Sequence, residues 1–227
     1  MRILAIDTAL GACAAAVLDS RAGAILASES AAMLRGHAEA IMPLIARVMD
    51  AGRCEFHDLD RIAVTVGPGS FTGLRVGISA ARGIALAAGK PAVGLTTLEA
   101  YAAPFIAHDA ETAVAVAIDA RHQHVYLQIF DPGGRSLAAP RIASVSDAAR
   151  AAAANGPVRI VGTGATMLAS AWPSGQPAPA LVEDRRAPDI VWVGRLAVAA
   201  NHTSEPKPLY LRAPDAQPQD AARLPRR

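Results

Sequence analysis

The sequence predicts an α/β protein made of two lobes. Two observations indicate this class: strand-like runs open the chain, and a second set begins near residue 113, each followed by alternating helical and strand-like segments. Hydrophobic residues make up 52% of the 227 residues and charged residues 19%, so a sizeable core can form. Aromatic residues make up 4%, so Ala, Val, Ile and Leu must supply most of that core.

The first half of the chain predicts three strands and then a mixed region. Strands are expected at residues 2–7, 13–19 and 24–30, with short Gly- and Ser-containing connections that favour antiparallel hairpins. Apolar residues at three- and four-residue spacing predict a helix over residues 37–51. Further elements are a strand at 61–66, a helix at 72–88, a strand at 92–95 and a helix at 98–105.

The second half repeats the β pattern. Strands are expected at residues 113–118 and 125–130 around a polar turn, then a helix at 146–154, a strand at 158–161, a loop at 172–179 and a helix at 187–200. We place the lobes at residues 1–106 and 107–212. Pro and scattered charge predict a disordered tail over residues 213–227.

Charge and cysteine content restrict the partners and the compartment. The net charge is +2, without a basic cluster or interleaved aromatic residues, so any contact with tRNA is expected to be indirect. Cys13 and Cys54 are far apart and predict buried, reduced side chains. We expect a cytoplasmic protein that does not bind membranes, because the chain has neither a secretion-type start nor a run of ~18 apolar residues.

A glycine loop between a strand and a helix, VGPGSFTGLRVGISAARGIA at residues 66–85, suggests a phosphate site. Its spacing fits neither GxxxxGK[ST] nor GxGxxG, so both standard phosphate loops are excluded. A looser site for an anion or nucleotide stays open at Asp7, Thr8, Ser70, Thr72 and Arg75. Thr72 or Ser70 could cap the helix, and we expect Arg75 to pair with Asp7 or Glu99 in preference to an anion.

Metal and nucleophile motifs are not found. The six His residues form neither HxxxH nor HExxH, and Ser70 does not lie in GxSxG. The sequence therefore predicts no metal site and no catalytic residue in this chain.

Small residues recur at every fourth position of the helix after the glycine loop: Gly73, Gly77, Ala81, Ala85 and Gly89. Such residues share one helix face and allow close packing. From the spacing alone, this chain's own sheet and a partner helix are equally good neighbours.

Several segments together identify a family. They are DTALGACAAAVLD, RGHAEAIMPLI, GPGSFTGLRVGISAARGIA, GLTTLEAYA, DAR-x3-VY and PLYLR. In this order they resemble the bacterial TsaB family, also called YeaZ, from residue 3 to about residue 212. The resemblance implies an actin-like ATPase (ASKHA) fold with two RNase-H-like lobes. It also implies a non-catalytic role in making threonylcarbamoyladenosine (t6A) next to the tRNA anticodon, with TsaD as the transferase and TsaE as an ATPase.

The resemblance also implies which residues differ from TsaD, which binds metal through an HxxxH helix. Thr97 and Tyr101 stand at the corresponding positions here, and hydroxyl groups lack the imidazole donors of that site. The chain departs from the TsaB pattern as well. Ala9 and Leu10 replace the usual Ser and Thr, which weakens the expectation of ATP binding, and His124 replaces a common Glu.

The resemblance places the partner surface on the two N-lobe helices, facing TsaD or a second copy in a homodimer. The expected residues are His37, Ile41, Met42, Ile45, Met49, Gly73, Gly77, Ala81 and Ala85. ATP or ADP is expected, if anywhere, at the interface of the complex. Two alternatives stay open: an actin-fold small-molecule kinase or ATPase acting on its own, and a peptidase, a label attached to relatives, for which the chain has no protease constellation.

Overall fold

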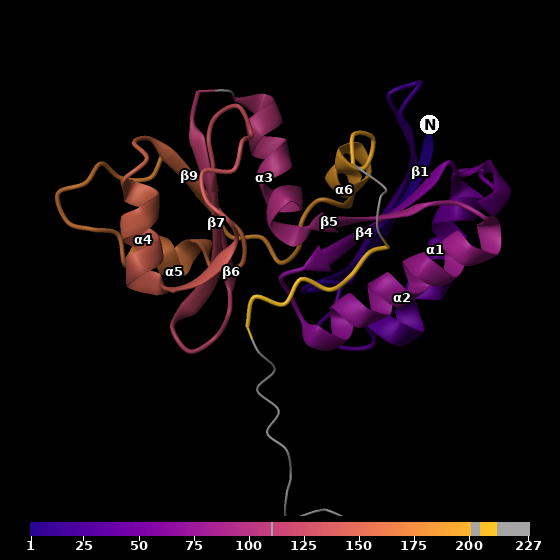
Figure 1. Ribbon diagram of the computed structural model, residues 1–227, viewed down its shortest axis with the longest axis horizontal. Coiled ribbons are helices and arrows are strands. Elements are labelled where there is room, and N and C mark those ends of the chain that lie inside the picture. Colours follow the sequence, from indigo (N-terminus) through magenta and orange to yellow (C-terminus); the bar gives the residue numbers. More distant parts are fainter. Residues whose placement is uncertain (110, 201–204, 213–227) are drawn as a thin grey trace, which may run out of the picture.

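A computed structural model describes residues 1–109, 111–200 and 205–212 of the chain. It contains two five-stranded sheets with helices on their faces, and the N-terminal half of the chain forms one lobe and much of the C-terminal half the other (Figure 1). The predicted tail at residues 213–227 lies outside the described residues.

The first sheet has the order β3-β2-β1-β4-β5. Its strands are β1 (Arg2–Asp7), β2 (Ala12–Asp19), β3 (Ala24–Ala32), β4 (Arg61–Gly67) and β5 (Ala92–Thr96). β1, β2 and β3 pair antiparallel, which confirms the predicted hairpins, whereas β4 pairs parallel with β1 and with β5. β1 is buried from its second residue on because it lies in the middle of this sheet, with helices on both faces.

The second sheet repeats this topology. Its strands are β6 (Ala113–Asp119), β7 (His124–Phe130), β8 (Arg141–Ser144), β9 (Val158–Val161) and β10 (Leu181–Glu183). The order β8-β7-β6-β9-β10 is that of the first sheet, again with three antiparallel strands followed by two parallel ones. The sequence prediction missed the short strands β8 and β10.

In the part of the chain that the structure describes, six α-helices cover the sheets. They are α1 (His37–Ala51), α2 (Phe71–Ala88), α3 (Thr97–His108), α4 (Val145–Ala153), α5 (Ala165–Ser170) and α6 (Ile190–Leu196), with a 3₁₀ turn at Phe56–Asp58. α1 and α2 pack side by side on one face of the first sheet, and α4 and α5 cover one face of the second (Figure 1). The helix expected at residues 187–200 is shorter because Asp189 caps it, accepting from Val191 N at 2.9 Å.

The last helix of each half packs on the opposite sheet. Leu98, Tyr101 and Ala102 of α3 share a core with Val114 and other residues of the second sheet. Ile190, Val193 and Ala197, on α6 and just after it, share a core with β1 and β2 of the first. Ala100 of α3 also packs in the core of the first sheet, so α3 lies between the two sheets, and the division at residues 106 and 107 stays a prediction.

No helix of the described residues is long and apolar enough to cross a membrane.

Candidate functional site: the glycine loop and the helices it launches

The glycine loop lies directly against the end of β1. Ser70 N donates to Ala9 O at 2.7 Å, and Ser70 Oγ caps α2 by accepting from Gly73 N at 3.3 Å. A Cβ atom on Gly69 would overlap the carbonyl oxygen of Ala9, so this position requires glycine. Ser70 is therefore the cap, and Thr72 lies exposed inside the first turn, which makes the prediction of a Thr72 cap wrong.

Asp7 closes β1 with its carboxylate inside the protein. Asp7 Oδ1 accepts from Ala9 N at 3.1 Å and from the hydroxyl of Thr65, whereas Oδ2 has no partner among the described residues. Burial raises the pKa of Asp7, and the Thr65 and Ala9 hydrogen bonds oppose this rise. Thr8 is buried too, and its Oγ1 donates to Gly73 O at 2.7 Å. Both side chains thus link β1 to its neighbours.

Arg75 does not form either of the predicted ion pairs. Its Nε donates to Tyr210 Oη at 3.2 Å, and its guanidinium lies 3.9 Å from the centre of the Phe71 ring. Glu99 instead completes a capping box with Thr96 at the start of α3. Asp7 is fully buried and Arg75 is exposed. An anion role for Asp7, Thr8, Ser70, Thr72 and Arg75 stays a prediction.

The small-residue stripe of α2 faces this chain's own sheet. A Cβ atom on Gly73 would overlap Thr8 O, and one on Gly77 would overlap Thr8 Oγ1. Ala81 and Ala85 belong to the core between α1, α2 and the first sheet. The interpretation of these four residues as partner-facing is wrong, because the packing of α2 on Thr8 and β4 already uses the space that they leave.

Most of the α1 residues predicted to meet a partner are also buried. Ile41, Ile45 and Met49 lie in the same core, and His37 Nε2 forms a hydrogen bond with Leu10 O at 3.2 Å. Met42 is the exception, with 48% of its surface exposed. The helical periodicity identified the apolar face of α1 correctly, but that face is the core face.

The opposite sides of α1 and α2 form a second, exposed small-residue surface. We call it the outer helical face; its residues are Ala38, Met42 and Ala46 on α1 and Ser79, Gly83, Leu86 and Ala87 on α2. Leu86 is 85% exposed, and a Cβ atom on Gly83 would meet nothing within 4 Å. Gly83 lowers the helix propensity of α2 by about 1 kcal/mol, and no contact within the described chain requires it.

The two positions where the resemblance implies the histidines of an HxxxH motif, Thr97 and Tyr101, are both buried here. Thr97 is buried, and Tyr101 Oη donates to Arg185 O at 2.9 Å across the lobes. Among the residues that the structure describes, no three His, Cys, Asp or Glu side chains gather to hold a metal ion.

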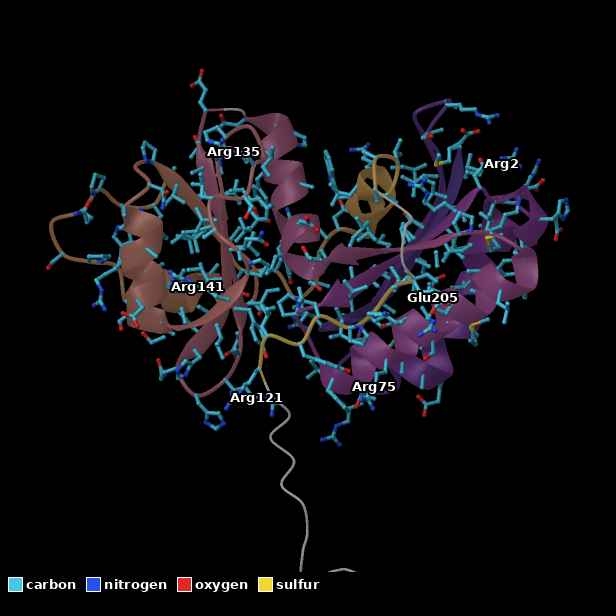
Figure 2. The ribbon with its side chains drawn as sticks, in the orientation of Figure 1. Arg2, Arg75, Arg121, Arg135, Arg141 and Glu205 are labelled. Atoms are coloured by element: carbon cyan, nitrogen blue, oxygen red, sulfur yellow. The ribbon has the colours of Figure 1, made fainter. Side chains whose placement is uncertain are left out.

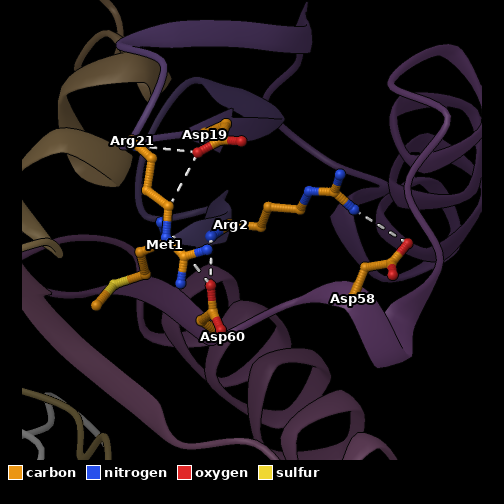
Figure 3. Close-up of a pocket in the computed structure, with 6 residues that line it drawn as sticks. All are labelled: Met1, Arg2, Asp19, Arg21, Asp58 and Asp60. Atoms are coloured by element: carbon orange, nitrogen blue, oxygen red, sulfur yellow. Dashed lines mark hydrogen bonds and ion pairs between the residues drawn. The ribbon is translucent and has the colours of Figure 1, made fainter.

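A polar pocket of about 230 Å³ lies at the other end of β1 (Figure 3). Its lining residues are Met1, Arg2, Asp19, Arg21, Asp58 and Asp60. Arg2 forms an ion pair with Asp58 at 3.2 Å, and the backbone amides of Arg2 and Arg21 donate to Asp60 and Asp19. The carboxylates of Asp19, Asp58 and Asp60 each pair with a group of Met1, Arg2 or Arg21. The pocket is separate from the glycine loop, because it lies at the opposite end of β1.

Comparison with known proteins places the chain among its relatives. The family model of TsaD, tRNA N6-adenosine threonylcarbamoyltransferase, matches residues 25–173. The chain is 39% identical over 126 residues to the tRNA threonylcarbamoyladenosine biosynthesis protein TsaB of Escherichia coli (strain K12), covering 56% of this chain and 53% of the relative. It is 31% identical over 219 residues to an uncharacterized protein of Mycobacterium tuberculosis (strain ATCC 25618 / H37Rv), covering 95% and 94%.

Two solved structures share the fold of this chain over most of its length. YeaZ from Pseudomonas aeruginosa has a TM-score of 0.71 at 25% identity and covers 92% of this chain and 99% of its own. A second P. aeruginosa structure, described as similar to peptidase YeaZ, has a TM-score of 0.79 at 27% identity and covers 93% and 99%. The chain belongs to the TsaB (YeaZ) family.

These matches confirm the resemblance to the TsaB family and the predicted actin-like ATPase fold with two lobes. The match to the TsaB chains of E. coli and Haemophilus influenzae spans about half of their length, 53% and 52%. The PilM-PilN type IV pilus biogenesis complex shares the fold alone, with a TM-score of 0.50 at 11% identity.

Sequence reasoning named Met42 but missed the other residues of the outer helical face and Tyr210. Leu86 and Gly83 carried a signal, since a leucine and a glycine on the polar side of an amphipathic helix are unexpected. No pattern in the sequence points to Tyr210, because its neighbours Phe71 and Arg75 lie far away in the sequence.

Proposed function

We propose that this chain is a non-catalytic scaffold subunit in the biosynthesis of t6A in tRNA, which binds and activates a TsaD-family transferase through the outer helical face. Membership of the TsaB family supports the pathway, because the E. coli relative is named a tRNA threonylcarbamoyladenosine biosynthesis protein. The single observation that carries the docking surface is Gly83, a helix-weakening residue that stands open to solvent beside Leu86.

The kind of partner follows from shared ancestry. The TsaD family model covers residues 25–173, which include α1 and α2, and the TsaD of Erythrobacter litoralis is 46% identical to this chain over 68 residues. A TsaD-family protein therefore carries an equivalent pair of helices. Two such pairs can pack as a pseudo-symmetric four-helix arrangement, in which the small residues Ala46, Ser79 and Gly83 let the backbones approach.

The two positions of this chain that correspond to the transferase's HxxxH histidines support a non-catalytic role. Thr97 is in the core, and Tyr101 ties α3 to Arg185. Both side chains serve packing, so the chemistry of the pathway belongs to the partner. We place TsaE and any ATP or ADP at the assembled complex, in the cytoplasm, and expect a second copy of this chain to occupy the same face when the partner is missing.

Co-purification with the TsaD-family protein of the same organism tests the proposal. Met42→Glu and Leu86→Glu each place a charge on the outer helical face without touching the core. Each should weaken the complex at least 30-fold, about 2 kcal/mol, as expected for a central interface residue. Leu137→Glu is the matched control, since Leu137 is similarly exposed on the other lobe.

Unchanged binding by both face variants would contradict the docking surface. Turnover of ATP with a small-molecule acceptor by the isolated chain would favour the kinase alternative instead.

A further inference from the structure

The C-terminal segment of the described chain returns to the glycine loop and rebuilds its surface. Leu209 N donates to Val66 O at 2.7 Å, at the end of β4, and Glu205 pairs with Arg82 of α2. These contacts place Tyr210 on Phe71, with the ring centres 5.5 Å apart and the rings stacked. Phe71 and Tyr210 are 46% and 43% exposed, so two aromatic rings and Arg75 share one solvent-facing cluster.

The same segment continues to the β6–β7 turn of the other lobe. Arg212 donates through Nη1 to Ala120 O at 3.1 Å, which ties it to the backbone one residue before Arg121. Arg121, His122 and Gln123 all have positive φ angles, 63°, 51° and 58°. Three consecutive non-glycine residues in the left-handed region cost free energy, and such strain is concentrated at functional sites.

We define the cationic ridge as Phe71, Arg75, Tyr210, Arg212 and Arg121. Figure 2 shows Arg75 and Arg121 along the same edge of the molecule, one from each lobe. Among the described residues, Arg75 and Arg121 have no ion pair with a carboxylate. The nearby Asp119 accepts from the Arg121 amide at 2.7 Å through Oδ1, and it is the acidic side chain of this turn.

The chemistry of the ridge fits RNA. Guanidinium groups bind phosphates through several donors, and exposed aromatic rings stack on unpaired bases. Phe71 holds both Arg75 and Tyr210 in place, so little side-chain entropy remains to be lost on binding. The strained turn holds Arg121 in the same row.

We propose that the cationic ridge binds the phosphodiester backbone of RNA directly, with Arg75 and Arg121 on phosphates and Tyr210 stacked on an unpaired base. The choice of RNA rests on the proposed function, whereas the test needs no partner protein. The inference replaces the expectation of indirect contact, which considered charges along the sequence and not their positions in the fold.

Fluorescence anisotropy tests this with the full chain and a fluorescein-labelled anticodon stem-loop RNA. Arg75→Ala combined with Arg121→Ala should weaken binding at least tenfold at moderate salt. The slope of log K against log salt should fall by about 1.4 to 1.8, for two lost phosphate contacts. Tyr210→Ala should weaken binding about tenfold and leave the slope unchanged.

The control is Arg135→Ala combined with Arg141→Ala, which removes the same charge from the second lobe away from the edge that carries Arg75 and Arg121 (Figure 2). It should bind RNA like the wild type. The proposal is overturned if the wild type does not bind, if both double variants lose the same affinity, or if the ridge variant binds RNA normally. A ridge variant that binds RNA normally but no longer binds the TsaD-family partner would identify the ridge as a protein surface. The two proposals fail separately: a ridge variant should lose RNA binding and keep partner binding, whereas an outer-helical-face variant should lose partner binding and keep RNA binding.

Discussion

Two glycines of α2 should respond in opposite directions to the same substitution. Gly77 and Gly83 lie six residues apart in one helix, but Gly77 faces Thr8 and Val64 of β4, whereas Gly83 faces solvent. Gly77→Ala and Gly83→Ala therefore add one methyl group to the same backbone conformation in two different environments.

The magnitudes follow from what each methyl group would meet. At Gly77 the new Cβ overlaps Thr8 Oγ1 and lies 3.5 Å from Val64 Cγ2. Thr8 is buried and hydrogen-bonded to Gly73 O, so it cannot swing away freely. Overpacking costs about 1–3 kcal/mol and the disturbed hydrogen bond about 1 kcal/mol, offset by about 1 kcal/mol of helix propensity. Gly77→Ala should destabilise the chain by about 2 kcal/mol.

At Gly83 only the propensity term operates. Nothing lies within 4 Å of the added Cβ, so Gly83→Ala should stabilise the free chain by about 1 kcal/mol. Urea unfolding followed by circular dichroism measures both changes, and equal m-values would show that the unfolded states are comparable. If Gly77→Ala is as stable as Gly83→Ala, the close packing of α2 on Thr8 and β4 is wrong.

Two further predictions concern buried titratable groups. Burial raises the pKa of Asp7 above 3.8, so the stabilisation that protonated Asp7 contributes is complete below that pH and is lost as pH rises through the raised folded value. Asp7→Asn should therefore lose less stability than the wild type as pH rises above about 4, and parallel pH profiles in urea unfolding would contradict this. Burial raises the pKa of the Cys13 thiol to about 11, so little thiolate forms in the native chain at about pH 8. Iodoacetamide at that pH should label Cys13 after denaturation but not in the native chain. Labelling at equal rates in both states, measured by mass spectrometry, would disprove the burial.

The sequence predicted local features of the fold well. The alternating runs of β1, β2 and β3 and their short connections specify antiparallel hairpins, because pairing between neighbours needs no distant information. The apolar spacing of α1 likewise identified its core face. The reciprocal packing of α3 and α6 could not be predicted this way, since periodicity shows that a face is apolar but not which sheet covers it.

The same limit explains the errors at the candidate site. Gly73 and Gly77 clearly share a face, but the spacing does not distinguish Thr8 of the same chain from a partner helix. Arg75 and Tyr210 are 135 residues apart, so their contact exists only after the C-terminal segment returns to β4. Exposed residues such as Leu86 become informative once the core face is known.

The scaffold proposal requires that the outer helical face of this TsaB-family chain binds a TsaD-family protein at Gly83. Isothermal titration calorimetry with Gly83→Leu tests it most directly, because nothing in the chain opposes a side chain at this position and the free protein should stay folded. Gly83→Leu should raise the dissociation constant at least 30-fold while its unfolding free energy stays no lower than that of the wild type. A Gly83→Leu chain that binds the partner with wild-type affinity would contradict it.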